Sequence, residues 1–252
     1  MGEALAMARL AAADGVRHVV ATPHQERWDA LRCQQVQAQL QHFQRELALG
    51  GVQLAVSSGV ELMLTHDLLE TTGNERAHTL NGSRYLLVEL PVYDYPLSTA
   101  DVIFAVQLRG LVPILAHPER CAAFQDDINK MVVLAGRGVL GQLTVGSLAE
   151  GADRDIRRCA ERLLKRGLVQ LLASDGHDTE LRAPRLADGV RAAARVVHDE
   201  RAQAMVTHVP EAILADRAFE PATLLPPQPE RRWGGLQLLR RDRDWRHRSK
   251  CP

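Results

Sequence analysis

Short apolar runs and longer amphipathic stretches alternate along most of the chain. Six runs rich in Val, Leu and Ile have the length of buried strands, and they span residues 16–22, 52–57, 85–90, 112–116, 138–144 and 168–173. A parallel strand, its crossover helix and the next strand take about 30 residues or more, which agrees with the spacing of these runs. The pattern therefore predicts an α/β fold built on parallel strands.

Helical periodicity fills most of the segments between the apolar runs. The expected helices span residues 2–14, 27–49, 65–71, 98–109, 122–136, 151–166, 185–197 and 199–206. The repeated alternation is typical of a TIM-like α/β barrel, in which chemistry collects at the carboxyl ends of the strands. One feature departs from that pattern, because a parallel barrel normally opens with a strand and this chain opens with a helix.

Five of the six expected strands run into a carboxylate or an imidazole. The residues at these strand ends are His24, Glu61, Glu89, His117, Asp175 and His177. The run at 138–144 is the one expected strand without such a residue. Because the carboxyl ends of parallel strands meet at one face of the fold, we expect the six side chains to converge there.

Each of these residues taken alone has an ordinary explanation. A single histidine at a strand end is more often a hydrogen-bonding residue than a metal ligand. Glu89, however, lies inside the apolar run YLLVEL, and a carboxylate in a buried strand is costly unless it is paired or bound to a cation. Together the residues favour a site for divalent ions such as manganese, iron or zinc, which accept mixed His, Glu and Asp ligands.

Two arginines follow the last strands closely enough to reach the same face. Arg120 lies in the motif HPER after His117, and Arg182 lies shortly after His177. Guanidinium groups bind phosphate through two parallel hydrogen bonds, although a surface ion pair is the ordinary alternative for each of them. Divalent metals beside arginines indicate hydrolysis of a phosphate ester.

The composition restricts the class of protein. The chain has 252 residues, of which 46% are hydrophobic, and no apolar run approaches the roughly 18 residues that a membrane helix needs. Its N-terminus lacks the basic region of a secretory signal, and its four cysteines form no CxxC pair, so we expect free thiols and a cytoplasmic protein. The absence of a Cys-x5-Arg motif also argues against a phosphatase with a thiol nucleophile.

The end of the chain differs in composition from the rest. The Pro-rich segment PPQPE at 226–230 precedes a tail, residues 231–250, with eight Lys or Arg and two Asp. We therefore divide the chain into a body, residues 1–225, and a linker with a basic tail, residues 226–252. The tail is expected either to be a solvated terminus or to touch an anionic membrane surface or an acidic partner. Nucleic acid is not expected as a partner, because the basic excess is confined to this tail.

The motifs GVRHVVATPH, SSGVEL, YLLVELP, ILAHPER, GQLTVGSLAE and LLASDGH resemble the polymerase and histidinol phosphatase (PHP) superfamily. More narrowly, they resemble the manganese-dependent protein-tyrosine phosphatases of capsule and exopolysaccharide operons. The resemblance extends over residues 3–215 and implies a distorted (β/α)7 barrel with up to three Mn²⁺ ions. It further implies that this chain begins after a first strand that ends in Asp-x-His-x-His, either because the start is placed too far downstream or because the protein is degenerate.

The resemblance also implies a role for each candidate residue. Glu61 would bridge two metals, Glu89 and His117 would complete one of them, and Asp175 would serve the other. His24 and His177 would hold the third metal. Arg120 and Arg182 match the arginines that contact phosphate in this family, and Tyr93 and Tyr95 after Glu89 are expected either to flank a substrate ring or to pack within their loop.

The function implied is hydrolysis of phosphotyrosine on a bacterial tyrosine autokinase that controls polysaccharide export. Two alternatives remain open. One is a small-molecule phosphomonoesterase such as a histidinol-phosphate phosphatase. The other is an inactive module that still binds the kinase, because the chain lacks several metal ligands of the family.

Overall fold

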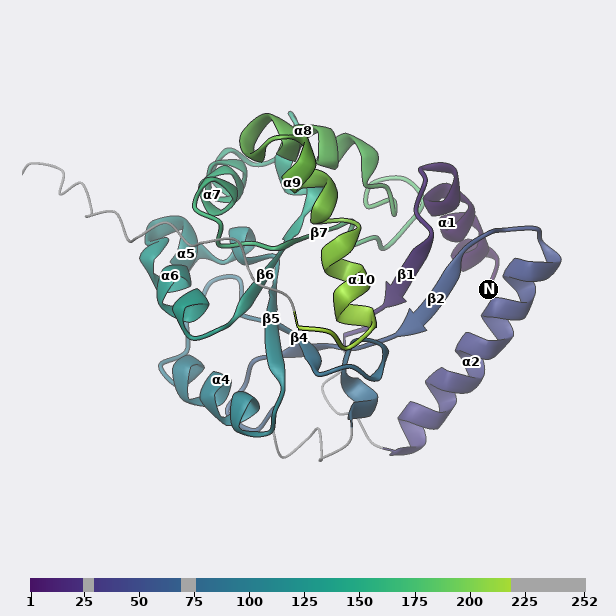
Figure 1. Cartoon of the computed structure of the whole chain (residues 1–252), viewed down its shortest axis with the longest axis horizontal. Coiled ribbons are helices and arrows are strands. Elements are labelled where there is room, and N and C mark those ends of the chain that lie inside the picture. The colour runs from purple at the N-terminus through teal and green to yellow at the C-terminus, as the bar shows by residue number, and fades with distance from the viewer. Residues whose placement is uncertain (25–29, 69–75, 219–252) are drawn as a thin grey trace, which may run out of the picture.

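The chain folds around parallel strands that are surrounded by helices (Figure 1). The structure is a computed structural model that describes residues 1–24, 30–68 and 76–218. The strands are β1 (His18–Ala21), β2 (Ala55–Ser58), β3 (Glu61–Met63), β4 (Tyr85–Glu89), β5 (Val112–Ala116), β6 (Leu140–Thr144) and β7 (Leu171–Ala173). All pairings between them are parallel, which confirms the α/β class.

The strands form two sheets, with the orders β1-β2 and β3-β4-β5-β6-β7. An isolated parallel bridge between His24 and Glu61 connects the two. Among the described residues no ladder joins β7 to β1, so the strand pairing does not establish the closed barrel that the sequence predicts. The observed architecture is an open run of parallel strands in sequence order.

The expected strand over 52–57 begins later in the structure, as β2, which starts at Ala55 and ends at Ser58. Gly59 and Val60 then separate β2 from β3, a short strand that the sequence pattern did not predict. A Cβ atom on Gly59 would lie 2.7 Å from Cδ2 of Leu80, so a larger residue does not fit at this break. The break shifts Glu61 into a strand of its own and next to His24, which is an arrangement that the apolar pattern does not reveal.

The helices are α1 (Gly2–Ala13), α2 (Ala30–Leu49), α4 (Thr99–Leu108), α5 (Ala122–Asp126), α6 (Asn129–Gly136), α7 (Arg154–Lys165), α8 (Ala187–Val197), α9 (Asp199–Ala204) and α10 (His208–Leu214). Short 3₁₀ turns are η1 (Arg76–His78), η2 (Leu80–Gly82), η3 (Pro118–Arg120) and η4 (Val145–Leu148). The prediction missed α10. The short helix expected over 65–71 lies partly outside the described residues.

The single helix expected over 122–136 is in fact two helices. Asp127 has an extended backbone between α5 and α6, and its Oδ1 accepts a hydrogen bond of 2.9 Å from the backbone N–H of Asn129. Aspartate competes with helical hydrogen bonding in this way more readily than most residues. The chain therefore turns between the two helices, where the apolar periodicity alone indicated continuity.

Both faces of the larger sheet are buried. Successive residues of β4 alternate between two hydrophobic clusters, with Leu86 and Val88 in the larger cluster beneath the helices and Tyr85 and Leu87 in the smaller one. This explains why the strands appear in the sequence as continuous apolar runs, because a side chain on either face meets apolar neighbours.

Hydrogen bonds between distant segments attach each end of the body to its interior part. Oδ2 of Asp14, at the end of α1, accepts hydrogen bonds from the backbone N–H groups of Leu186 and Ala187, at 2.6 and 2.9 Å. These are orphan donors at the start of α8, which a carboxylate caps well. Near the other end, the Asp216 carboxylate accepts from the backbone N–H and from Nε of Arg84, both at 2.8 Å.

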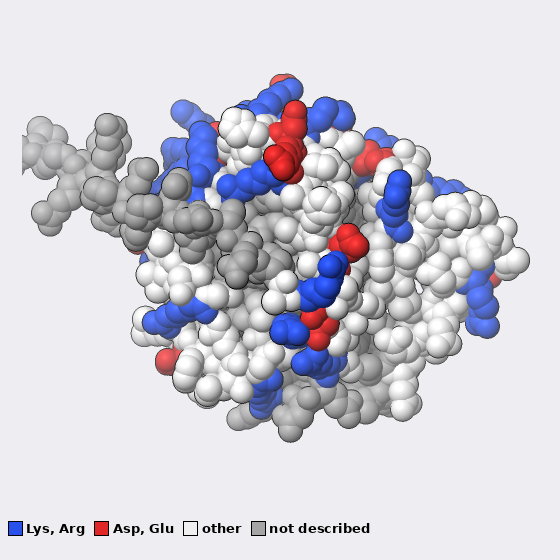
Figure 2. Space-filling model, in the orientation of Figure 1, with Lys and Arg blue, Asp and Glu red and all other residues white. Residues whose placement is uncertain are grey.

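The charged surface and the length of the helices can be described for part of the chain. On the face in Figure 2, basic and acidic side chains of the described residues are intermixed, without a continuous basic stripe. A membrane could not be crossed by any helix in the described part of the chain, since each is too short or too polar. The predicted linker and basic tail, residues 226–252, lie outside the described residues.

Candidate metal and phosphate site

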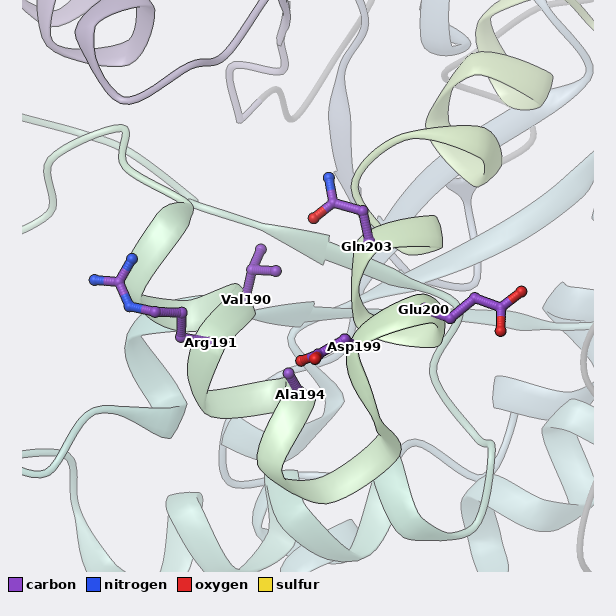
Figure 3. Close-up of a pocket in the computed structure, with 6 residues that line it drawn as sticks. All are labelled: Val190, Arg191, Ala194, Asp199, Glu200 and Gln203. Atoms are coloured by element: carbon purple, nitrogen blue, oxygen red, sulfur yellow. The ribbon is translucent and has the colours of Figure 1, made fainter.

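A groove lies between α8 and α9 (Figure 3), and none of the predicted site residues lines it. It is lined by Val190, Arg191, Ala194, Asp199, Glu200 and Gln203. These residues lie on two helices of the outer layer, and none of them follows a strand. The predicted site residues lie instead near the ends of the parallel strands.

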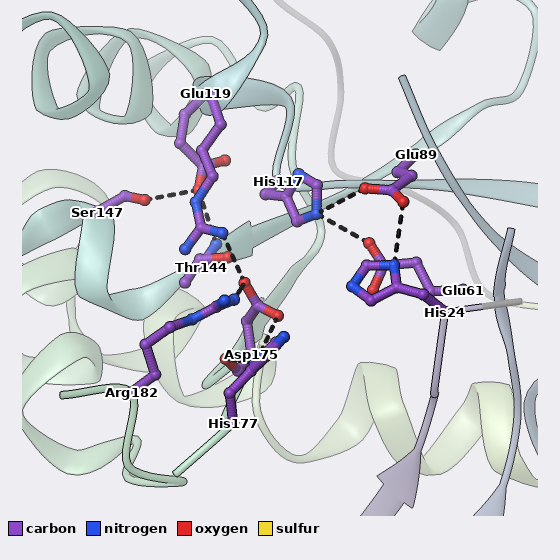
Figure 4. Close-up of polar contacts among 11 residues, drawn as sticks. His24, Glu61, Glu89, His117, Glu119, Thr144, Ser147, Asp175, His177 and Arg182 are labelled. Atoms are coloured by element: carbon purple, nitrogen blue, oxygen red, sulfur yellow. Dashed lines mark hydrogen bonds and ion pairs between the residues drawn. The ribbon is translucent and has the colours of Figure 1, made fainter. Parts of the chain in front are cut away.

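Four of the predicted ligands form one contiguous cluster at those ends (Figure 4). Nε2 of His117 lies 2.8 Å from Oε1 of Glu61 and 3.6 Å from Oε2 of Glu89. Nδ1 of His24 lies 3.0 Å from Oε1 of Glu89. Glu89 ends β4, His117 directly follows β5 and His24 follows β1, whereas Glu61 begins the unpredicted strand β3.

The donors of this cluster suit a divalent cation. His24, Glu61 and Glu89 each offer a ligand atom, and these atoms all lie within 4.8 Å of one another. Two carboxylates so close together repel each other unless a cation or a proton lies between them. Oxygen and imidazole nitrogen donors without a thiolate fit a hard or borderline ion such as Mn²⁺. The residues present therefore fit the metal that the resemblance implies.

His117 is held in an unusual backbone conformation. Its φ of 32° and ψ of 52° lie in the left-handed region, which is uncommon for residues other than glycine. Burial by itself lowers the pKa of His117, but the hydrogen bond to Glu61 and the charge of that carboxylate raise it by more, so the net pKa lies above its ordinary value. Backbone conformations of this kind persist only where the surroundings enforce them, and they concentrate at functional sites.

The two arginines form a second cluster around Asp175. NH1 of Arg120 donates to Oδ2 of Asp175 at 2.8 Å, and NH2 of Arg182 donates to the same oxygen at 2.5 Å. Asp175 also has a left-handed backbone, with φ of 51°. One largely buried carboxylate thus holds two guanidinium groups next to each other.

The structure divides the predicted residues differently from the roles that the resemblance implies. Asp175 was expected among the metal ligands, and here its Oδ2 is bound by both arginines. His177 stands between the clusters, since its Nδ1 lies 2.9 Å from the Asp175 carbonyl oxygen and its ring centroid lies 6.2 Å from that of His24. The eight predicted residues therefore gather at one face, in two adjoining groups.

Sequence reasoning missed a third set of polar residues behind these clusters. Glu119 is fully buried, and its Oε1 accepts hydrogen bonds from the backbone N–H of Thr144 at 3.0 Å and from Oγ of Ser147 at 2.8 Å. Burial raises the pKa of the Glu119 carboxyl strongly, although both hydrogen bonds act in the opposite direction. Two sequence features could have indicated this set of residues. One is the acid between the Pro and the Arg of HPER, and the other is the pair of hydroxyl residues, Thr144 and Ser147, at and just after the end of the expected strand that carries no metal ligand.

Two further expectations concern side chains near the site. Cys121 and Cys159 are buried free thiols, and burial raises the pKa of both, that of Cys159 to about 12, so neither is an activated nucleophile. Tyr95 packs edge-on against Phe124 with ring centroids 5.8 Å apart, so for this residue loop packing is the correct alternative. Tyr93, by contrast, is 92% exposed and remains free to contact a substrate.

Comparison with known proteins identifies a family for this sequence. Residues 1–215 match the model of the family described as "Capsular polysaccharide synthesis, CpsB/CapC". A putative tyrosine-protein phosphatase CapC of Staphylococcus aureus is 29% identical over 178 residues, which cover 70% of each chain. Tyrosine-protein phosphatase YwqE of Bacillus subtilis is 27% identical over 184 residues, 71% of each chain.

The fold has a counterpart among solved structures. Crystal structures of YwqE from Bacillus subtilis and CpsB from Streptococcus pneumoniae are described as those of unique metal-dependent tyrosine phosphatases. The match has a TM-score of 0.80 at 23% identity and covers 90% of this chain and 92% of the other. Because the family model spans most of the sequence, including every strand and all eight candidate residues, the chain belongs to the CpsB/CapC family of capsular polysaccharide synthesis.

Proposed function

We propose that this protein is a metal-dependent phosphatase that hydrolyses phosphotyrosine in a protein substrate. The observation that carries the proposal is the meeting of two groups at the strand ends, the cluster of His24, Glu61, Glu89 and His117 and the pair of arginines on Asp175. The relatives of the CpsB/CapC family named above are tyrosine-protein phosphatases, which gives the substrate class. We further infer that the parallel strands belong to a (β/α)7 barrel.

The residues that would hold the metal are His24, Glu61, Glu89 and His117, with Asp175 and His177 adjoining them. We propose Mn²⁺ for this site, because oxygen and imidazole donors suit it. A divalent ion bound there supplies Lewis acidity and an activated water at neutral pH. The left-handed backbone of His117 aims its imidazole at Glu61, and the short contact between them fixes the orientation of both ligands.

The arginines bind the phosphoryl group and stabilise its charge in the transition state. Arg120 and Arg182 each direct one nitrogen to Asp175, so phosphate oxygens entering the site compete with that carboxylate for the same donors. A guanidinium bound to a phosphate oxygen in a partly water-excluded site stabilises negative charge better than it does in water. Binding of substrate therefore exchanges one anionic partner of the arginines for another.

The leaving group of the reaction, a tyrosine phenolate, requires little assistance from an acidic side chain. The hydroxyl of tyrosine has a pKa of about 10, so its phenolate departs without a strong general acid. The buried thiols of Cys121 and Cys159 take no part, since their pKa values are raised. Hydrolysis then requires only the metal ligands and the two arginines among the residues described here.

The site is open enough for a phosphotyrosine that is part of a protein. The His24 side chain is 55% exposed, so one edge of the cluster faces solvent. Leu181, which directly precedes Arg182 in the chain, and Tyr93, which follows Glu89 in the chain, are also exposed.

We propose a bacterial tyrosine autokinase of polysaccharide export as the partner and the cytoplasm as the site of action. The family description, capsular polysaccharide synthesis, supports this assignment. A cytoplasmic location would give the protein access to the phosphorylated kinase and would keep its cysteines reduced.

The test is an assay of the full chain with a phosphotyrosine peptide, with histidinol phosphate and with the autophosphorylated kinase, each with added MnCl₂. We expect turnover of the peptide and the kinase, loss of activity with a chelator and no effect of thiol alkylation. Turnover of histidinol phosphate alone would assign a small-molecule esterase. Kinase binding without any turnover would assign the inactive binding module, and inhibition by alkylation would contradict the metal mechanism.

A further inference from the structure

The strand that carries no metal ligand nevertheless reaches into the site. Thr144 ends β6 and Ser147 lies in η4, directly after it. The backbone N–H of Thr144 and the hydroxyl of Ser147 both donate to Oε1 of Glu119, at 3.0 and 2.8 Å (Figure 4). Oε2 of Glu119 has no hydrogen-bond partner among the described residues. The end of β6 therefore holds one particular carboxylate oxygen.

Glu119 lies in the turn that carries a residue of each cluster. In η3, His117 is the residue before the turn, Arg120 ends it, and the backbone N–H of Arg120 donates to the His117 carbonyl oxygen at 2.9 Å. The carbonyl oxygen of Glu119 also accepts from Nε2 of Gln125 at 2.9 Å. Both the main chain and the side chain of Glu119 are thus tied to neighbouring segments.

A carboxylate buried to this degree is costly, and the two hydrogen bonds to Oε1 are its compensation. Moving the turn away from β6 would break these bonds and leave a buried acid without partners. Glu119 therefore contributes directly to the position of the turn. The left-handed backbone of His117 needs such an enforcing contact.

We propose that Glu119 is a positioning residue that sets the metal ligand His117 and the phosphate-binding Arg120 at the same time, with Thr144 and Ser147 as its anchor. This inference rests on the proposed function for the roles of His117 and Arg120. His117 belongs to the cluster of proposed metal ligands, and Arg120 donates to Asp175. Loosening the turn between them should therefore weaken metal binding and phosphate binding together. A residue that only stabilised the core would lower stability and leave both affinities unchanged.

The first test replaces Ser147, which touches neither cluster. Ser147→Ala removes one of the two donors to Glu119. The matched control is Ser83→Ala, because Ser83 is also buried and its hydroxyl donates to the Leu80 carbonyl oxygen at 2.6 Å, in the turn before β4. The readouts are Mn²⁺ affinity and inorganic phosphate affinity of the full chain by calorimetry, the kcat and KM for a phosphotyrosine peptide, and thermal stability.

We expect Ser147→Ala to weaken binding of both Mn²⁺ and phosphate and to lower kcat/KM about tenfold, since a misplacement of about 1 Å costs up to about a hundredfold in rate. Ser83→Ala should lose stability while keeping affinities and kcat/KM within about twofold of the original chain. The proposal is overturned if Ser147→Ala keeps all three values, or if Ser83→Ala lowers them equally.

A second pair of variants separates positioning from folding. The side-chain amide oxygen in Glu119→Gln can still accept from Thr144 and Ser147, whereas Glu119→Ala offers no acceptor. We expect the Gln variant to bind Mn²⁺ at least tenfold more tightly than the Ala variant, and equal binding by the two would contradict the proposal. If the original chain does not hydrolyse phosphotyrosine but Ser147→Ala still weakens Mn²⁺ and phosphate binding, the proposed function fails and the positioning role stands.

Discussion

Replacing Glu61 by Gln tests the metal cluster at its most buried carboxylate. Glu61 is 5% exposed, and its Oε1 lies 2.8 Å from Nε2 of His117. A glutamine oxygen can keep that hydrogen bond, so the fold should be retained in the absence of metal. The variant loses the anionic charge that, with Glu89, attracts a divalent ion.

The size of the effect follows from linkage between binding and folding. An ion that binds only the folded chain and is present at a hundred times its Kd stabilises the chain by about 2.7 kcal/mol. For a domain of roughly this size, each kcal/mol raises Tm by about 2–4 °C, so Mn²⁺ should raise Tm by about 5–10 °C. If Glu61→Gln weakens binding a hundredfold, the same concentration contributes about 0.4 kcal/mol and raises Tm by only about 1 °C.

The assay is thermal unfolding of chelator-treated protein titrated with MnCl₂. The control is Glu161→Gln, which removes an acid on α7 that pairs with Arg157 away from the strand ends. We expect the control to gain the full shift and Glu61→Gln to gain little of it, with similar Tm values in chelator. An equal shift for Glu61→Gln and the original chain would refute the assignment of Glu61 as a ligand.

Three further predictions concern packing, pH and the arginines. A Cβ on Gly189 would lie 2.1 Å from Cβ of Val145, so Gly189→Ala should lower the free energy of unfolding in urea by about 1–3 kcal/mol. The control is Gly136→Ala, where a Cβ meets nothing within 4 Å, and its cost should be less than about 1 kcal/mol. Equal costs for the two variants would contradict the packing argument. Burial lowers the pKa of His78 from 6.5 to about 4, so the unfolded chain binds the proton first and stability falls as pH drops from about 6.5 to 4. His78→Leu should remove about 2–3 kcal/mol of that fall between pH 7 and pH 4, and parallel pH profiles would show that His78 does not cause it. Arg182→Lys should raise KM for the phosphotyrosine peptide about tenfold with little change in Tm, because lysine lacks the planar fork; an unchanged KM would exclude Arg182 from phosphate binding.

Much of the fold was predictable because both faces of the sheet are buried, so each strand appears in the sequence as a continuous apolar run. β5 begins and ends where its apolar run does, and β4 differs from its expected range by one residue. Elements set by local polar chemistry were harder to predict. The hydrogen bond of Asp127 divides one expected helix into α5 and α6, and a break at Gly59 and Val60 precedes β3, a short strand that was not predicted.

The sequence indicated which residues gather at the candidate site, but it did not indicate which of them contact one another. Strand ends of a parallel sheet meet at one face whatever the details, so His24, Glu61, Glu89 and His117 were expected together. The partners of Asp175 and the burial of Glu119 depend on distances between loops. No spacing along the chain encodes those distances.

The sequence by itself determined the α/β class, the order of most elements and the face on which polar residues converge, because apolar periodicity and strand direction are local properties. The tertiary structure alone decided that Asp175 pairs with both arginines, that His117 takes a left-handed backbone and that β6 anchors Glu119. These features depend on contacts between segments far apart in the chain. Only the packed fold fixes which of the possible partners each buried polar group meets.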